Sequence, residues 1–336
     1  MTAARGPDAL PKAELHVHLE GTAPPALVRR IAERNGLEVP DGLFATPDRF
    51  AWRDFLDFLH TYDLAAGVMR TAADYRDITF EYLAACAAEG TVYVELTASP
   101  DHARLVGLSD DEHLGGIAAG IDDARAAHGI EARILLTCIR NFGVEQAVRV
   151  AAHAAERPHP YVVGFSMAGD EAGYPPGPFA EAYAIAAAAG LGCTVHAGEW
   201  AGAASVREAL DLPISRIAHG VRAIEDPGVV REIAQRGIVL ECCPTSNVVL
   251  GVFDGYEAHP LPALREAGVK VTLASDDPPY FGASVGGEYA VARDRFGWGD
   301  AELIEVTRTA IEASFAEPEL RAALRRRLGD ADGRPT

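Results

Sequence analysis

The sequence has 336 residues, of which 49% are hydrophobic and 7% aromatic, so aliphatic side chains must fill most of a sizeable core. Its formal net charge of −19 repels phosphate groups, which argues against nucleic acid and anionic membranes as partners. No apolar run approaches the ~18 residues of a membrane span. The first ten residues contain no apolar segment, so we also expect no signal peptide.

Cysteine usage points to a reducing compartment. The five cysteines form no C-x-x-C motif, and their number is odd, so neither a disulfide framework nor a cysteine zinc cage is expected. The adjacent pair Cys242 and Cys243 is interpreted as two small buried hydrophobic residues. We therefore expect a cytoplasmic protein.

Short apolar segments alternate along the chain with longer segments of helical period. The eight segments expected to be strands are Ala13–Leu19, Thr91–Thr97, Ala132–Ile139, Tyr161–Met167, Gly192–Ala197, Arg216–His219, Gly237–Cys242 and Val269–Ala274. Continuous apolar strands that alternate with helices indicate a parallel sheet, and eight of them favour a closed (β/α)8 TIM barrel of the α/β class. Neither a linker nor a repeat divides the chain, so a single domain over residues 1–336 is predicted.

The segment between the first two strands is longer than one crossover helix requires. It contains Phe50, Trp52, Phe55 and Phe58, among other apolar residues. These aromatic side chains fit a lid over the barrel mouth, and they fit equally a helical insertion that packs its own small core.

Polar residues cluster where predicted strands end. His16 and His18 close the first strand, and they share one face because strand residues i and i+2 point the same way. His196 lies at the end of the fifth strand and His219 at the end of the sixth. Asp276 follows the eighth. Barrel enzymes build their sites at the carboxyl ends of the strands, so these side chains are expected to meet.

This combination predicts a metal site. A single H-x-H or a single histidine at a strand end is more often incidental, and Asp-Asp-Pro is commonly a turn. Three imidazoles and one carboxylate on successive barrel strands, however, suit a borderline ion such as Zn²⁺. We expect one zinc ion per chain.

In these segments the sequence resembles the adenosine deaminase family of metal-dependent amidohydrolases. The segments that carry the resemblance are Pro11–Gly21, Met167–Glu171, Val195–Glu199, Arg216–Gly220, Cys243–Asn247 and Ser275–Pro278. The resemblance implies that His16, His18, His196 and Asp276 bind zinc.

The resemblance also implies roles around a purine. Glu199 would carry the proton beside the ring and His219 would orient the reacting water. Asp277 would bind N7, and the backbone N–H of Gly169 would meet N3. Chemistry supports these roles, because attack at C6 disrupts the aromatic ring and requires an acid at N1. The ordinary alternative for Glu199 is an acid that complements a helix dipole.

Two features of the sequence point to different substrates. Met167–Glu171 resembles family members that act on nucleosides, whereas Glu20 stands where adenosine deaminases usually carry an aspartate that contacts ribose. Glu20 follows His18 by two residues and is expected on the same face, either binding a ribose or closing the pocket to it. We expect adenosine or a related adenine nucleoside as substrate, with water as co-substrate; adenine and aminodeoxyfutalosine are the alternatives.

Other classes fit less well. Barrel amidohydrolases that cleave an amide, a lactone or a phosphotriester often bridge two metals with a modified lysine, but neither Lys12 nor Lys270 falls at a bridging position. A non-catalytic zinc-binding relative would not need both Glu199 and Asp277. Cytidine-type deaminases require a P-C-x-x-C motif, which is absent. The remaining histidines are interpreted as surface or loop residues: His60, His102, His113, His128, His153, His159 and His259.

Overall fold

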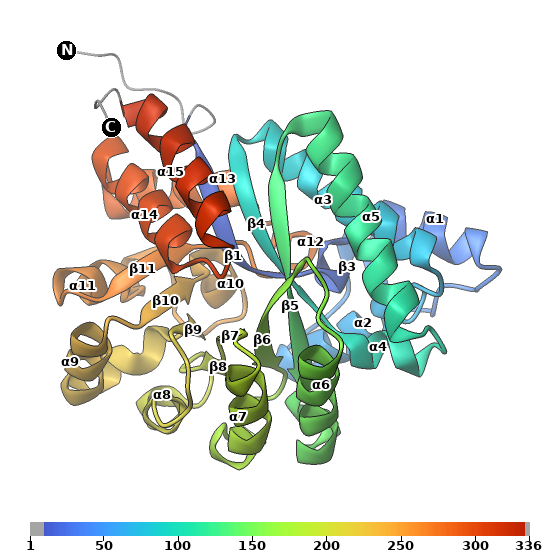
Figure 1. The fold of residues 1–336 in the computed structure, drawn as a ribbon, viewed down its shortest axis with the longest axis horizontal. Helices are drawn as coiled ribbons and strands as arrows, with labels where there is room; N and C mark the ends of the chain where they lie inside the picture. Colours follow the sequence, from blue (N-terminus) through green and yellow to red (C-terminus); the bar gives the residue numbers. More distant parts are fainter. Residues whose placement is uncertain (1–9, 333–336) are drawn as a thin grey trace.

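Eight parallel barrel strands form the centre of the molecule, and helices surround them (Figure 1). The computed structural model describes residues 10–332. Its barrel strands are β1 (Lys12–His18), β4 (Thr91–Ala98), β5 (Glu131–Ile139), β6 (Val162–Ala168), β7 (Gly192–Cys193) with β8 (His196–Ala197), β9 (Arg216–His219), β10 (Val239–Cys242) and β11 (Lys270–Leu273). Every predicted strand is confirmed to within two residues at its ends, and the predicted TIM barrel is confirmed.

The barrel closes through two irregular seams. At the first, the His18 N–H donates to the Asp276 carbonyl at 3.0 Å and the Asp276 N–H to the His16 carbonyl at 3.3 Å, so β1 meets the end of β11. At the second, the fifth strand is interrupted: β7 pairs with β6 and β8 pairs with β9. Hydrogen bonding continues across the interruption. The Thr194 N–H donates to the Phe165 carbonyl of β6, and the Ala218 N–H of β9 donates to the Val195 carbonyl.

The helices occupy the connections between strands. They are α1 (Pro25–Arg34), α2 (Phe55–Ala66), α3 (Ala72–Ala88), α4 (Pro100–Leu105), α5 (Asp110–His128), α6 (Val144–Glu156), α7 (Ala180–Ala188), α8 (Gly202–Ala209), α9 (Pro227–Arg236), α10 (Pro244–Val249), α11 (Leu261–Glu266), α12 (Pro278–Phe281), α13 (Val285–Phe296), α14 (Asp300–Ala313) and α15 (Pro318–Asp332). Local sequence sets their ends. Helix α5 begins at a capping box of Ser109 with Glu112 and ends at Gly129, whose φ of 69° suits glycine.

The long segment after β1 covers the barrel mouth. It contains the short antiparallel pair β2 (Phe44–Thr46) and β3 (Arg49–Phe50), followed by α2. Phe50 stacks on Tyr280 of α12 with ring centroids 4.0 Å apart, and Phe58 lies 5.1 Å from Phe281. Phe50 and Phe58 thus join the main hydrophobic core, so the segment is anchored to the barrel mouth and does not form a separate small core.

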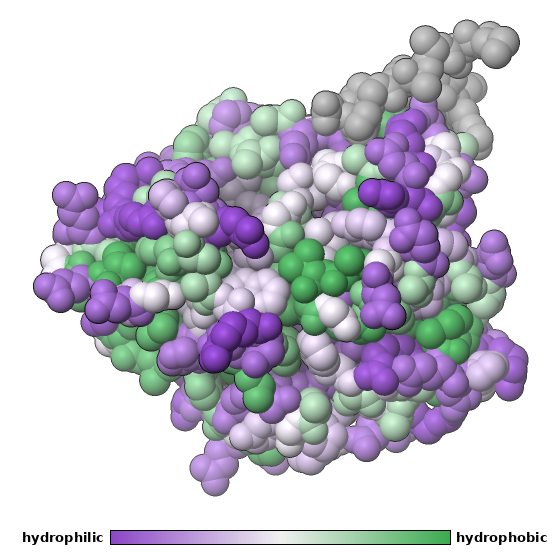
Figure 2. Space-filling view, turned by 180° about the vertical axis from the view of Figure 1, so that it is seen from behind, coloured by the Kyte–Doolittle hydropathy of each residue, from purple (hydrophilic) through white to green (hydrophobic). Residues whose placement is uncertain are grey.

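The surface and the cysteines agree with the composition. Hydrophilic side chains dominate the face seen in Figure 2, with smaller hydrophobic groups between them. Within residues 10–332, no helix combines the length and the apolar character needed to cross a bilayer. All five cysteines are buried free thiols, as expected for Cys242 and Cys243. The cytoplasmic location stays a prediction.

Candidate active site

The four predicted metal ligands meet at the carboxyl ends of the strands. Their ligand atoms all lie within 4.8 Å of one another. Asp276 Oδ1 is 3.3 Å from Nε2 of both His16 and His18, and the Nε2 atoms of His18 and His196 are 3.2 Å apart. Both ring nitrogens of His16 are buried, and each has a carboxylate oxygen within 3.5 Å, that of Asp276 at Nε2 and that of Glu241 at Nδ1. Three imidazoles and a carboxylate aimed at one buried point fit a borderline divalent cation.

Hydrogen-bond acceptors lie behind two of these imidazoles. His196 Nδ1 is 2.9 Å from the Met167 carbonyl, and His16 Nδ1 is 3.5 Å from Glu241 Oε2. An acceptor at Nδ1 places the proton there and leaves the Nε2 lone pair free for a metal. We call His16, His196 and the two acceptors behind them, Glu241 and the Met167 carbonyl, the acceptor side of the site.

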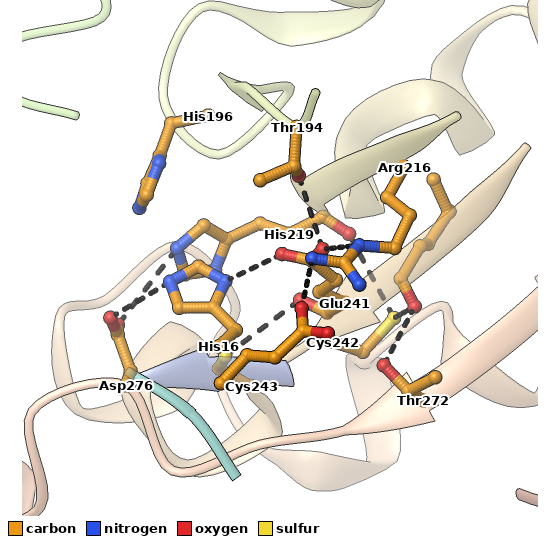
Figure 3. A network of polar contacts seen from close by, with 12 residues as sticks. His16, Thr194, His196, Arg216, His219, Glu241, Cys242, Cys243, Thr272 and Asp276 are labelled. Atoms are coloured by element: carbon orange, nitrogen blue, oxygen red, sulfur yellow. Dashed lines mark hydrogen bonds and ion pairs between the residues drawn. The ribbon is translucent and has the colours of Figure 1, made fainter. Parts of the chain in front are cut away.

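Glu241 is itself held in a buried network (Figure 3). Arg216 Nε lies 2.6 Å from Glu241 Oε1, and Thr194 donates to the same oxygen at 3.1 Å. Arg216 also pairs with Glu95 at 2.6 Å, so one buried guanidinium bridges two carboxyl groups. Burial raises the pKa of Glu241, but Arg216 and His16 outweigh it and hold the pKa below its usual value. Glu241 therefore faces His16 as a carboxylate.

Two strand ends carry unusual backbone geometry. His219 has φ of 60° and Asp276 φ of 64°, and within the described residues they are the only non-glycine residues with positive φ. Such a conformation costs of order 1–3 kcal/mol per residue and persists only where the surrounding structure enforces it. Ser246 donates to Asp276 Oδ2 at 2.6 Å and helps to hold that carboxylate. The strain falls on two residues of the predicted site.

A buried acid stands on the other side of the cluster. Glu199 is 4% exposed, and burial together with the charge of Asp276 raises its pKa well above the usual range. The turn that carries it is held by Glu171, which accepts from the backbone N–H groups of Gly198, Glu199, Trp200 and Ala201. Glu171 lies in a motif that the sequence singled out, but its role as a clamp was not foreseen.

Asp277 offers a second buried carboxyl. Its Oδ1 atom is buried without a partner, and burial and the neighbouring Asp276 raise its pKa well above the usual range. A Cβ on Gly21 would collide with this oxygen, so glycine is required to leave the carboxyl its place. An unpartnered buried oxygen in a pocket wall is a natural contact for a ligand.

A pocket opens above these groups, and Glu199, His219, Asp276 and Asp277 belong to its lining. Gly169 lies in its wall at φ of 107°, a conformation that favours glycine, and a Cβ there would collide with Asn141 Oδ1. Phe55, Phe58 and Tyr62 of α2 line the opposite wall. The inserted segment thus occupies the position of a lid; whether it moves stays a prediction.

Two expectations about residues near the pocket need correction. Glu20 does not line it, because β1 ends at His18 and Glu20 opens a 3-10 helix, Glu20–Thr22, so the alternation of strand residues no longer applies. Its buried carboxylate accepts from Tyr62 and from the Ser99 N–H.

Several histidines also lie deeper than predicted. His102 is 5% exposed, lines the pocket and contacts Asp63 at 2.8 Å, while His113 and His259 are buried. His102 lies close to the end of β4, and this place near a strand end was a signal in the sequence for a pocket residue. No comparable signal in the sequence indicated that His113 and His259 are buried.

Comparison with known proteins defines the class. The sequence model of the adenosine deaminase family matches residues 11–331, and the chain belongs to this family of metal-dependent amidohydrolases. It is similar to an adenine deaminase from Chelativorans sp. (strain BNC1), with 50% identity over 318 residues, 94% of this chain and 97% of the relative.

Solved structures agree. The crystal structure of an adenine deaminase from Arthrobacter aurescens superposes with a TM-score of 0.88 at 30% identity, covering 97% of this chain and 100% of that one. An amidohydrolase from Burkholderia ambifaria with bound zinc has a TM-score of 0.87 at 27% identity, covering 97% and 91%.

Proposed function

We propose that this enzyme hydrolyses free adenine to hypoxanthine and ammonia. Water adds its oxygen to C6, the C6–N6 bond breaks, and the amino group leaves as ammonia. The sequence favoured a nucleoside, but two of the similar proteins described above, those from Chelativorans and Arthrobacter aurescens, are named adenine deaminases, and they support the free base instead.

The position of Tyr62 is the observation that carries this choice. Its hydroxyl donates to Glu20 Oε2 at 3.2 Å, and its ring lies in the pocket wall 6.5 Å from the His18 ring and 5.6 Å from His102. Glu20, the residue considered for a ribose contact, is therefore engaged behind Tyr62. A sugar hydroxyl would have to displace both the ring and its hydrogen bond, which favours a substrate without a sugar.

The ligand set of His16, His18, His196 and Asp276 would hold one Zn²⁺, which supplies a nucleophilic hydroxide near neutral pH by lowering the pKa of water to ~7. Burial and the charge of Asp276 raise the pKa of Glu199 and so favour its protonated form, from which Glu199 would donate a proton to N1 as electrons move onto the ring.

The remaining groups orient the base. Burial and the neighbouring Asp276 raise the pKa of Asp277 as well, and its protonated carboxyl would donate to N7. The backbone N–H of Gly169, which lines the pocket, would meet the ring nitrogen N3. The residues of the pocket thus bind the base along its edges and deliver one proton to it.

Ammonia release from zinc-loaded protein tests the proposal. The substrates are adenine, adenosine, deoxyadenosine, methylthioadenosine and aminodeoxyfutalosine, compared by kcat/KM. We expect adenine to exceed each nucleoside. A nucleoside with a higher kcat/KM than adenine would overturn the assignment and restore the expectation drawn from the sequence.

A matched pair of variants tests the role of Tyr62. Tyr62→Ala removes the ring and should raise the adenosine-to-adenine ratio of kcat/KM at least tenfold, whereas Tyr62→Phe keeps the bulk and should change the ratio much less. Equal ratios in Tyr62→Ala and the unmodified protein would show that the ring does not exclude the sugar.

A further inference from the structure

A chain of hydrogen bonds leads from a backbone N–H to His219. It starts at Leu261, whose N–H donates to His259 Nδ1 at 3.2 Å. A backbone N–H can only donate, so Nδ1 of His259 must accept and the neutral ring carries its proton on Nε2. His259 is 4% exposed, and burial lowers its pKa to about 4, so the ring is neutral near pH 7.

Asn247 continues this order of donors and acceptors toward His219. Its Oδ1 lies 3.1 Å from His259 Nε2 and therefore accepts the proton of that ring. The amide nitrogen of Asn247, which can only donate, then faces His219 Nδ1 at 3.2 Å. Asn247 is fully buried, so water cannot substitute for either contact. The opposite orientation of the amide would place two donors against each other at His259.

We propose that His259 and Asn247 act as positioning residues that hold His219 in the tautomer with its proton on Nε2. That nitrogen faces the site, 3.7 Å from Glu199 Oε2 and 3.8 Å from Asp276 Oδ2. His219 thus presents an N–H to the reacting groups, whereas His16 and His196 present lone pairs. An imidazolium is disfavoured as well, because its second N–H would meet the donor N–H of the Asn247 amide.

The tautomer also decides which of two groups of candidate ligands can bind a metal ion. His219, Cys243 and Asp276 have ligand atoms within 4.8 Å of one another, as the four predicted ligands do. A protonated Nε2 has no lone pair to offer, so His219 does not ligate a metal in this arrangement. The assignment of the tautomer does not depend on the substrate, whereas its contribution to turnover rests on the proposed function.

Nitrogen NMR of the zinc-loaded protein labelled with ¹⁵N-histidine tests the assignment. Long-range ¹H–¹⁵N spectra distinguish protonated ring nitrogens from unprotonated ones, and the His219 signals are identified by their loss in His219→Gln. We expect an unprotonated Nδ1 and a protonated Nε2 for His219. A protonated Nδ1 on His219 would overturn the proposal whatever the enzyme's substrate.

Variants test the relay. His259→Leu removes the donor to Asn247 and should move His219 toward the other tautomer, lower kcat for adenine about tenfold and leave the zinc content unchanged. His259→Gln keeps a donor and should restore most of kcat. The exposed His128 supplies the control His128→Gln, which should lose its own signals but leave the His219 signals and the rate unchanged.

A second variant covers the case in which His259→Leu fails to fold. Asn247→Asp replaces the donor with an acceptor and should place the proton of His219 on Nδ1. An unchanged His219 spectrum in folded His259→Leu or Asn247→Asp would contradict the relay. If adenine is not deaminated but the His219 spectrum is as expected, the proposed function fails and the tautomer assignment stands.

Discussion

The two sides of the candidate site use the same side chain in opposite ways. On the acceptor side, a carboxylate and a carbonyl stand behind His16 and His196. On the other side, the donor side, the amide nitrogen of Asn247 stands behind His219. The acceptors turn lone pairs toward the cluster and the donor turns an N–H toward it. The group behind an imidazole thus determines whether it serves as a ligand or as a donor.

The largest effect is expected from removing ligands on the acceptor side. The double variant His16→Ala with His18→Ala should lose zinc and, with it, all measurable turnover, because no other group supplies the nucleophile. Zinc content by atomic absorption and ammonia release are the measurements. Activity that survives without bound metal would contradict the assignment of these residues.

A smaller loss is expected on the donor side. Glu199→Gln removes the acid beside His219 and should keep zinc and fold, while turnover falls by ~10²–10⁴-fold, the usual contribution of a positioned acid. Glu181→Gln, at an exposed position of α7, is the matched control. A near-normal rate in Glu199→Gln would mean that another group protonates the ring.

The smallest of these effects concerns the carboxylate behind His16. Glu241→Gln weakens the acceptor at Nδ1 without adding volume, so zinc affinity should fall by about 10–100-fold, measured by competition with a chelator. Glu232, which is partly exposed on α9 and lies outside the site, offers the control Glu232→Gln. If Glu241→Gln binds zinc as tightly as the unmodified protein, the acceptor behind His16 does not contribute to metal binding.

The barrel and the meeting of the strand-end residues were predictable from sequence because parallel strands end at one edge. His16, His196, His219 and Asp276 needed only that rule and the alternation of strand residues. The same rule was wrong for Glu20, because it assumed that the strand continues past His18. Where backbone geometry changes, side-chain direction no longer follows from spacing.

The supporting residues were not predictable in the same way. Asn247, His259 and Tyr62 reach the site from segments whose placement depends on tertiary packing, and nothing in their spacing connects them. Glu241 and Arg216 carried a usable signal, since each is a charged residue inside a predicted buried strand and requires a partner there. The identity of the partner still required the fold.

Neutron diffraction of the deuterated, zinc-loaded protein tests the difference between the two sides most directly, because it locates the exchangeable hydrogens. The account predicts deuterium on Nδ1 of His16 and His196 and on Nε2 of His219, with no deuterium on Nδ1 of His219. Deuterium on Nδ1 of all three rings would contradict it, since the groups behind the imidazoles would then not set their roles.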